Sequence, residues 1–156
     1  MVIQRWQSVL LLIAGLLMGA FTFLSLGQIQ LPEYTLNFTT LGFYIEGEAA
    51  EGAATGFVAR TWIFFIISLL SAIIPLVDIF LYRNLRLQKN LCLMEILFLL
   101  AVAAVGCAYG YNTIPGGEIG WSSLIIAPLL AFISVVAAYY RISSDQKLLR
   151  AADRIR

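Results

Sequence analysis

Four long intervals without a charged side chain constrain this sequence more than any other feature. They cover residues 6–32, 61–77, 96–117 and 119–140. A helix needs about 20 mostly apolar residues to cross the hydrocarbon core of a bilayer, which is about 30 Å thick. With single charged residues admitted near some of the ends, the intervals predict transmembrane helices at 8–27, 60–82, 91–111 and 122–140.

The overall composition agrees with a protein that is solvated by lipid. Of the 156 residues, 61% are hydrophobic and 12% are charged, whereas about a quarter of an ordinary soluble domain is charged. A soluble domain of this length has too little interior to bury so much apolar surface. We therefore predict an all-α membrane protein, a single four-helix transmembrane domain over residues 1–156. The composition excludes a soluble enzyme, a disordered tail and a nucleic-acid-binding module, so no nucleic acid partner is expected.

The basic residues indicate how these helices are oriented. Cytoplasmic flanks of transmembrane helices are enriched in Lys and Arg. Nine of the ten basic residues fall on the side that holds both termini, and Arg60 alone falls on the other. We predict cytoplasmic termini in a multi-pass protein of the bacterial inner membrane. The nine are Arg5, Arg83, Arg86, Lys89, Arg141, Lys147, Arg150, Arg154 and Arg156.

The outward connection at 28–59 predicts a small β-hairpin. Residues 34–45 are rich in the β-branched and aromatic side chains that suit a strand. Their alternation of apolar and polar positions slips between Thr39 and Gly42, where a turn or bulge would explain the change of phase. The Gly/Ala/Glu run at 46–56 is typical of a flexible connector. The second outward connection, 112–121, has a turn signal at 115–117 and is a candidate for one more short strand.

The tail at 141–156 predicts a separate amphipathic helix. Ser143 or Ser144 is a candidate N-cap, with Asp145 in the first turn. An apolar stripe lies opposite basic residues, and such a helix suits an anionic inner leaflet. We favour an anchor that enforces topology; the alternative is a docking site for a partner. The candidate interaction cluster on this side comprises Arg5, Arg83, Arg86, Lys89, Arg141, Lys147, Arg150 and Arg154.

Two carboxylates form the candidate intramembrane polar site. Asp78 is expected one turn before the end of the second helix and Glu95 one turn after the start of the third. Ionisable groups inside a membrane are costly and are functional candidates by default. Because the two helices are antiparallel neighbours, the carboxylates are expected at similar depth. We favour structural ion pairs with nearby basic residues. The alternative is that they face each other and share a proton or bind a ligand.

The sequence contains no inventory for an enzyme or for a cofactor. It has no His, and Cys92 and Cys107 are too far apart on one helix to bond to each other. We predict no catalytic residue, no cofactor and no metal site. Small residues at a spacing of four, at Gly15 and Gly19, Gly106 and Gly110, and Ala127 and Ala131, predict close helix packing. Pro75 and Pro128 are expected to kink helices at mid-span.

Three stretches resemble an uncharacterised four-span family of Bacteroidetes membrane proteins, domain of unknown function 4293. They are residues 1–14 at the start, residues 80–88 with Leu91 and Cys92 in the inner loop, and residues 145–156 at the end. The last departs slightly, with Gln146 where an acidic residue is usual. The resemblance implies an integral inner-membrane protein of unknown activity and supplies no catalytic residue. The layout also looks like the claudin-type architecture, by analogy only, because the outer loop lacks that family's paired cysteines.

These features lead to two functional hypotheses of different class. The first is a non-enzymatic subunit or scaffold of a larger membrane assembly, with a membrane-protein partner or a second copy of the chain bound beside the lipid bilayer. Small size and interaction-type features at both faces motivate it. The alternative is a small transporter or a lipid- or hydrophobic-ligand-binding protein that uses the region of Asp78 and Glu95 and the helices containing proline.

Overall fold

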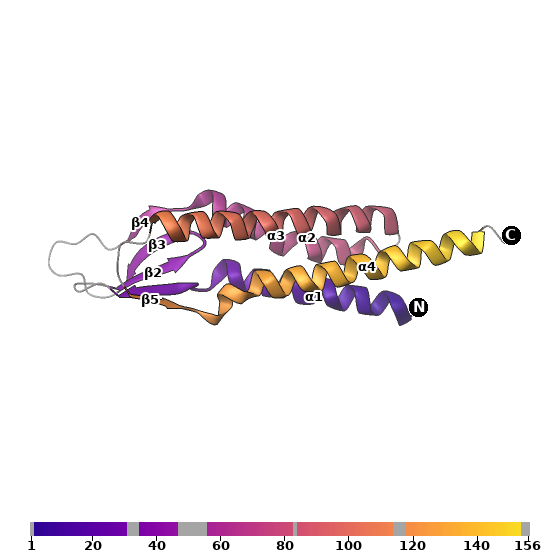
Figure 1. Cartoon of the computed structure of the whole chain (residues 1–156), viewed down its shortest axis with the longest axis horizontal. Helices are drawn as coiled ribbons and strands as arrows, with labels where there is room; N and C mark the ends of the chain where they lie inside the picture. Colours follow the sequence, from indigo (N-terminus) through magenta and orange to yellow (C-terminus); the bar gives the residue numbers. More distant parts are fainter. Residues whose placement is uncertain (1, 31–34, 47–55, 83, 114–117, 154–156) are drawn as a thin grey trace.

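A computed structural model describes residues 2–30, 35–46, 56–82, 84–113 and 118–153. This part of the chain forms an elongated bundle of four long helices with a five-stranded sheet at one end (Figure 1). Both termini lie at the opposite end. The helices are α1 (Val2–Phe23), α2 (Trp62–Phe80), α3 (Leu85–Thr113) and α4 (Ala127–Asp153), and a short 3-10 helix, η1 (Ser123–Ile126), precedes α4.

Each of the four helices contains a stretch that is long and apolar enough to cross a membrane. These stretches are Trp6–Phe23, Trp62–Phe80, Leu85–Tyr109 and Ser123–Leu148. Around the bundle, α1 packs against α2 and α4, and α3 packs against the same two helices. The prediction of a mostly helical chain with four long apolar helices is therefore confirmed.

The ends of the helices differ from the predicted ranges. Helix α1 stops at Phe23, and Gly27 already belongs to a strand. Helix α3 begins at Leu85, six residues earlier than predicted. Asn84 explains this start, because its side-chain oxygen accepts a hydrogen bond from the backbone N–H of Leu87 at 3.4 Å, as an N-cap does. The earlier start of α3 places Glu95 deeper along the helix than predicted.

The prediction of a separate C-terminal helix is wrong. Helix α4 continues without a break through Ser143 and Ser144 to Asp153, so neither serine caps a helix. Ile142 is fully buried and extends the packed face of α4, and no Gly or Pro interrupts the sequence there. Pro128 is also misplaced in the prediction, because it is the second residue of α4. Proline is tolerated in a first turn, where its missing N–H has no helical partner.

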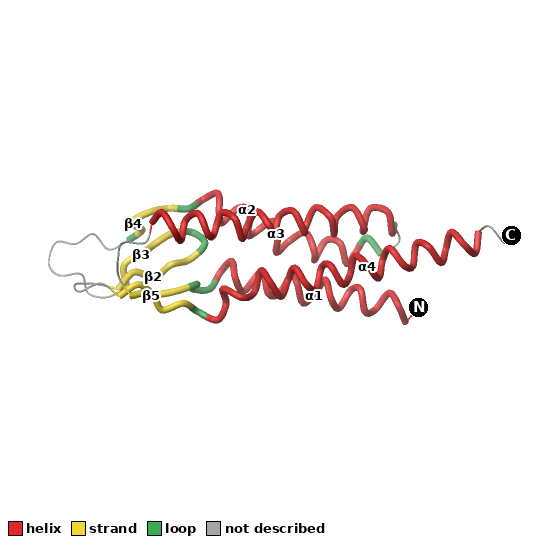
Figure 2. Tube along the Cα trace, viewed as in Figure 1, coloured by secondary structure: helices red, strands yellow, loops and turns green. Residues whose placement is uncertain are grey.

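The sheet is larger than the predicted hairpin and includes it. Strands β2 (Thr35–Thr39) and β3 (Gly42–Glu46) pair antiparallel around a turn at Thr40 and Leu41, as the slip in alternation predicted. Strand β1 (Gly27–Gln30) adds to β2, and β4 (Phe57–Arg60) adds to β3. The connection between α3 and α4 supplies β5 (Glu118–Trp121), which pairs with β1. The strand order is β4-β3-β2-β1-β5, and Figure 2 shows the strands gathered at one end of the bundle. Of the predicted connector at 46–56, residues 47–55 lie outside the described residues.

Buried hydroxyl groups attach the sheet to the bundle. The Thr61 hydroxyl donates to the carbonyl of Thr40 at 2.8 Å, and the Thr40 hydroxyl donates to the carbonyl of Thr22 at 2.6 Å. The Thr22 hydroxyl donates to Met18 O at 2.7 Å and lies 2.7 Å from the hydroxyl of Ser68. These bonds join the β2–β3 turn to α1 and α2, and they give every hydroxyl in the group a partner.

Candidate functional site

The candidate polar site lies between α2 and α3 and extends deeper than the sequence suggested. Asp78 occupies the last turn of α2, two residues before its end at Phe80. Glu95 lies ten residues after the start of α3 at Leu85, which corresponds to about 15 Å along the helix at about 1.5 Å per residue. Both side chains are 1% exposed. Glu95 is therefore well inside the bundle rather than one turn from a helix end.

Polar side chains from both helices surround the two carboxylates. The Cys92 thiol donates to Oδ2 of Asp78 at 3.2 Å, and the Gln88 amide donates to the backbone carbonyl of Asp78 at 3.5 Å. Asp78 and Glu95 are close enough to interact electrostatically, and the hydroxyl of Ser71 lies beside Glu95 without meeting hydrogen-bond geometry. The structure thus brings the two predicted residues together and adds three neighbours.

Most oxygen atoms in this cluster lack a hydrogen-bond partner. Buried polar atoms in proteins are nearly always hydrogen-bonded, and each exception calls for an explanation. Among the described residues, Oδ1 of Asp78, both carboxylate oxygens of Glu95, Oε1 of Gln88 and the hydroxyl of Ser71 are buried and unpaired. The cluster is therefore a concentration of unused acceptors inside the bundle.

The favoured ion pairs are not found among the described side chains. Lys89 turns towards α4, where its ammonium group lies 3.4 Å from the Ser143 hydroxyl and 5.2 Å from the centre of the Tyr139 ring. Arg86 and Arg141 are exposed. The side chains of Arg5 and Arg83 lie outside the described residues, so pairing with either of them stays a prediction.

The candidate basic cluster lies at the end of the bundle that holds the termini (Figure 1). Arg86, Lys89, Arg141 and Lys147 belong to α3 and α4, and all but Lys89 are exposed. Arg150 belongs to α4 but its side chain is not described, and Arg154 lies outside the described residues. The described members are therefore on neighbouring helices, and three of them are free to face solvent or lipid headgroups.

Polar contacts at this end fix α4 to the other helices. The Gln7 amide of α1 donates to the Asp145 carboxylate, and the Gln146 amide donates to the backbone carbonyl of Leu85 at the start of α3. Lys89 adds its contact with Ser143. Part of the polar sequence at this end is thus explained by helix packing.

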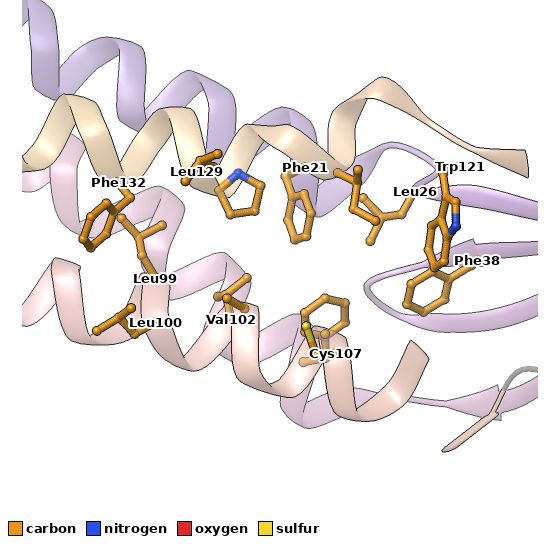
Figure 3. Close-up of a pocket in the computed structure, with 15 residues that line it drawn as sticks. Phe21, Leu26, Phe38, Leu99, Leu100, Val102, Cys107, Trp121, Leu129 and Phe132 are labelled. Carbon is orange, nitrogen blue, oxygen red and sulfur yellow. The ribbon is translucent and has the colours of Figure 1, made fainter. Parts of the chain in front are cut away.

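An apolar cavity of about 610 Å³ lies between α3 and α4 beneath the sheet (Figure 3). In Figure 3, Leu99, Leu100 and Val102 of α3 lie across the space from Leu129 of α4 and Phe21 of α1, and Trp121 and Phe38 lie at its sheet end. The complete lining is Phe21, Leu26, Phe38, Phe64, Leu99, Leu100, Val102, Ala103, Gly106, Cys107, Trp121, Ile125, Pro128, Leu129 and Phe132.

The cavity opens sideways between the helices. The lining side chains of Leu100 and Leu129 are 53% and 60% exposed, so they form a rim on the lateral surface of the bundle. Ala103 and Cys107 are also exposed. An apolar molecule beside the bundle could therefore enter without crossing the sheet.

This cavity does not follow from the sequence pattern, although Gly106, which lines it, belongs to a small-residue motif. The motif predicts close packing of Gly106 against the backbone of another helix. The atoms nearest to its missing side chain instead belong to the Phe64 ring, at 3.4 Å from an ideal Cβ. The available signal was the spacing of Ala103, Gly106 and Cys107 on one face of α3, where three small side chains leave space. Because the residues around that space are almost all apolar, the sequence does not indicate that it is a binding site.

A family model described as a domain of unknown function (DUF4293) matches residues 3–155. The chain belongs to this family. The match covers nearly the whole sequence and confirms the resemblance found in the three stretches at residues 1–14, 80–92 and 145–156. No curated protein matches the chain, so the family contributes no activity and no functional residue.

Proposed function

We propose that this member of the DUF4293 family is a bacterial inner-membrane protein with four transmembrane helices that binds the acyl chain of a lipid in its lateral cavity. The membrane setting is supported by four spans of sufficient length and apolarity. It is also supported by large apolar side chains that point outward along the helices, such as Leu16, Ile63, Leu97 and Ile133, each more than half exposed. Such a belt is costly in water and favourable in lipid.

The orientation follows from the two ends of the bundle. The basic residues gather at the end with the termini, whereas Arg60 lies at the sheet end. By the positive-inside rule, the termini are cytoplasmic and the sheet is outside. A protease site appended after residue 156 tests this, because it should be cut in inside-out vesicles and protected in right-side-out vesicles. The reverse result contradicts the orientation.

The lateral cavity is the observation that supports an acyl chain as the ligand. Its volume of about 610 Å³ falls in the range of about 300–1,000 Å³ that is typical of ligand sites. Its lining is almost entirely apolar, which excludes a charged ligand, and its rim at Leu100 and Leu129 faces the side from which lipid approaches. An acyl chain has the required apolarity and reaches the rim without leaving the bilayer. The proposal is a form of the ligand-binding alternative, with the site at the cavity rather than at Asp78 and Glu95.

Photocrosslinking tests the site. The protein is reconstituted with a phospholipid that carries a diazirine on one acyl chain, and labelled peptides are mapped by mass spectrometry. Ala103→Phe fills the cavity, because Ala103 lines it. Ala104→Phe is the matched control, since Ala104 is exposed on the next position of the same helix and does not line the cavity. We expect several-fold less labelling of cavity peptides in Ala103→Phe and unchanged labelling in Ala104→Phe.

Equal labelling in the two variants would refute acyl-chain binding in the cavity. A third variant, Leu129→Ala, guards against misreading a folding defect. It widens the rim, so labelling should stay equal or rise while the protein remains monodisperse in detergent. A fall in labelling in Leu129→Ala would also count against the proposal.

The scaffold hypothesis stays a prediction alongside this proposal. It is supported by α4, which continues beyond the other helices at the end with the termini (Figure 1), and by the exposed Arg141 and Lys147. Purification in mild detergent followed by identification of co-purifying chains tests it, and a monomer without a stoichiometric partner contradicts it. The absence of enzymatic activity and the claudin-type analogy likewise stay predictions.

A further inference from the structure

The cluster around Asp78 and Glu95 has more hydrogen-bond acceptors than donors. Ionised carboxylates accept hydrogen bonds and donate none, and the Gln88 Oε1 atom only accepts. The Cys92 thiol is already directed at Asp78, and the Gln88 amide is already directed at a backbone carbonyl. Four carboxylate and amide oxygens and the Ser71 hydroxyl therefore remain buried without a partner among the described residues.

A purely structural polar contact in this bundle looks different. At Thr22 and Ser68, two hydroxyls face each other at 2.7 Å and one of them also donates to Met18 O. Donors and acceptors are matched there, as expected for polar side chains that join helices in a membrane. Beside Glu95 the one O–H donor of Ser71 cannot satisfy both carboxylate oxygens, so helix packing alone does not explain them.

Binding of protons would correct this excess of acceptors over donors. Each proton bound by a carboxylate removes a buried negative charge and converts one acceptor into an O–H donor. The oxygens available to accept from that donor are those of the second carboxylate, Ser71 and Gln88, which are buried and unpaired. A multidentate metal ion is the competing explanation, but no group of three or more His, Cys, Asp or Glu side chains in the described residues is arranged to hold one.

We propose that Asp78 and Glu95, with Ser71 and Gln88 as hydrogen-bonding neighbours, form an intramembrane proton-binding site. Among the described side chains the groups that act on the pair are few: Asp78 and Glu95 act on each other, and Cys92 lies beside both. Lys89 is directed away to α4, and Asp145 is engaged with Gln7. Protons enter from the cytoplasmic end, because Asp78 and Gln88 lie in the turns that flank the α2–α3 connection.

This inference rests on the membrane insertion and orientation proposed above but not on the lipid cavity. A failure of the photocrosslinking experiment would therefore leave it standing. In turn, a failure of the infrared experiment below would leave lipid binding untouched, since neither Asp78 nor Glu95 lines the cavity.

Infrared spectroscopy of the protein in proteoliposomes tests the site directly. A protonated carboxylic acid has a C=O stretching band that is separate from those of the ionised carboxylate and the peptide group. At neutral pH we expect such a band in the wild type, lost in the double variant Asp78→Asn/Glu95→Gln. The control is Asp145→Asn, which removes a partly buried carboxyl group of α4 that is paired with Gln7 and lies outside the cluster, and it should leave the band unchanged.

Isotope labelling keeps the test independent of folding. Incorporation of side-chain ¹³C-carboxyl Asp or Glu into the wild type must shift the band with at least one of the two labels. Absence of any protonated-carboxyl band at neutral pH overturns the proposal, as does a band that survives in the double variant. Replacement of choline by Na⁺ in the buffer gives the last discrimination, because loss of the band in Na⁺ would assign the site to a metal cation instead.

Discussion

Substitution of Gly15 tests how closely α1 and α2 approach each other. An ideal Cβ at Gly15 would lie 2.8 Å from Cδ2 and 3.0 Å from Cγ of Leu76, and 3.4 Å from the carbonyl oxygen of Ala72. An ideal Cβ at Gly19, one turn further along the same helix, meets no atom within 4 Å. The two glycines of one motif therefore differ sharply in what an added methyl group would cost.

The expected free energies follow from two opposing effects. Ala in place of Gly inside a helix stabilises by about 0.5–1 kcal/mol, and forcing a methyl group into packed surroundings costs about 1–3 kcal/mol. Gly19→Ala should therefore be stabilising by about 0.5–1 kcal/mol. Gly15→Ala should lose about 0–2.5 kcal/mol, because Leu76 has to move. The difference between the two variants is the overpacking cost alone.

Unfolding of each variant by SDS in mixed micelles measures these differences. A double-mutant cycle adds a control, since Leu76→Ala removes the atoms nearest to the added methyl group. In that background, Gly15→Ala and Gly19→Ala should become similar. If Gly15→Ala proves as stable as Gly19→Ala in the wild-type background, the close approach of α1 and α2 at this position is refuted.

Three further outcomes concern single contacts. Thr22→Val should lower the free energy of unfolding by about 0.5–1.5 kcal/mol, because the Thr22 hydroxyl has two buried partners. The control Ser134→Ala removes a hydroxyl that is bonded within its own helix and should change the free energy of unfolding little in the same SDS titration. Gly42→Ala should prevent formation of the sheet, since its Cβ would lie 2.0 Å from a carbonyl oxygen at a φ of +142°. Gly56→Ala, at a φ of +148°, has no neighbour within 4 Å and should cost only about 1–3 kcal/mol of backbone strain. Thermal unfolding followed by circular dichroism distinguishes the two variants. Gln146→Glu removes the donor to a carbonyl of α3 and should lower the melting temperature in detergent, and an unchanged melting temperature would show that this bond does not join α3 to α4.

The helices and the β2–β3 hairpin could be predicted from the sequence because both depend on local patterns. Uncharged intervals define the four long apolar helices, and the phase slip between Thr39 and Gly42 defines the turn. The sequence offers the short strand in 112–121 as a candidate, and β5 confirms it. Strand β1 is not predicted, because it has four residues and lies between β2 and β5, the second of which is distant in sequence. The predicted end of α1 is wrong for the same reason, since Gly27 pairs with Phe38 and Trp121 in the sheet.

The residues of the candidate site could be predicted from the sequence, but their depth and their partners could not. Asp78 and Glu95 are recognisable as charges in apolar helices, and their proximity follows from a short connection. The predicted position of Glu95, one turn after the start of its helix, is wrong because α3 begins at the Asn84 cap, which lies among polar and basic residues that the apolar pattern does not include. Lys89 does not pair with the carboxylates because it contacts Ser143 and Tyr139 of α4. No local pattern on α3 reveals these contacts.

The polar residues, rather than the apolar ones, mark the interior face of α2 and α3. In a soluble helix the buried face is the apolar stripe, but these helices are apolar on every side, so apolarity does not distinguish lipid from interior. The buried positions on α3 recur every three or four residues, as in left-handed helix packing. They are Gln88, Cys92, Glu95, Leu99 and Val102, of which Gln88 and Glu95 are polar. The buried side of α2 likewise carries Ser68, Ser71 and Asp78. Because an unsatisfied polar group is expensive in hydrocarbon, it turns towards the interior and reports the packed face. A helical plot of Ser, Thr, Gln, Asp and Glu alone is therefore sufficient to place α2 against α3 with Asp78 and Glu95 facing inward.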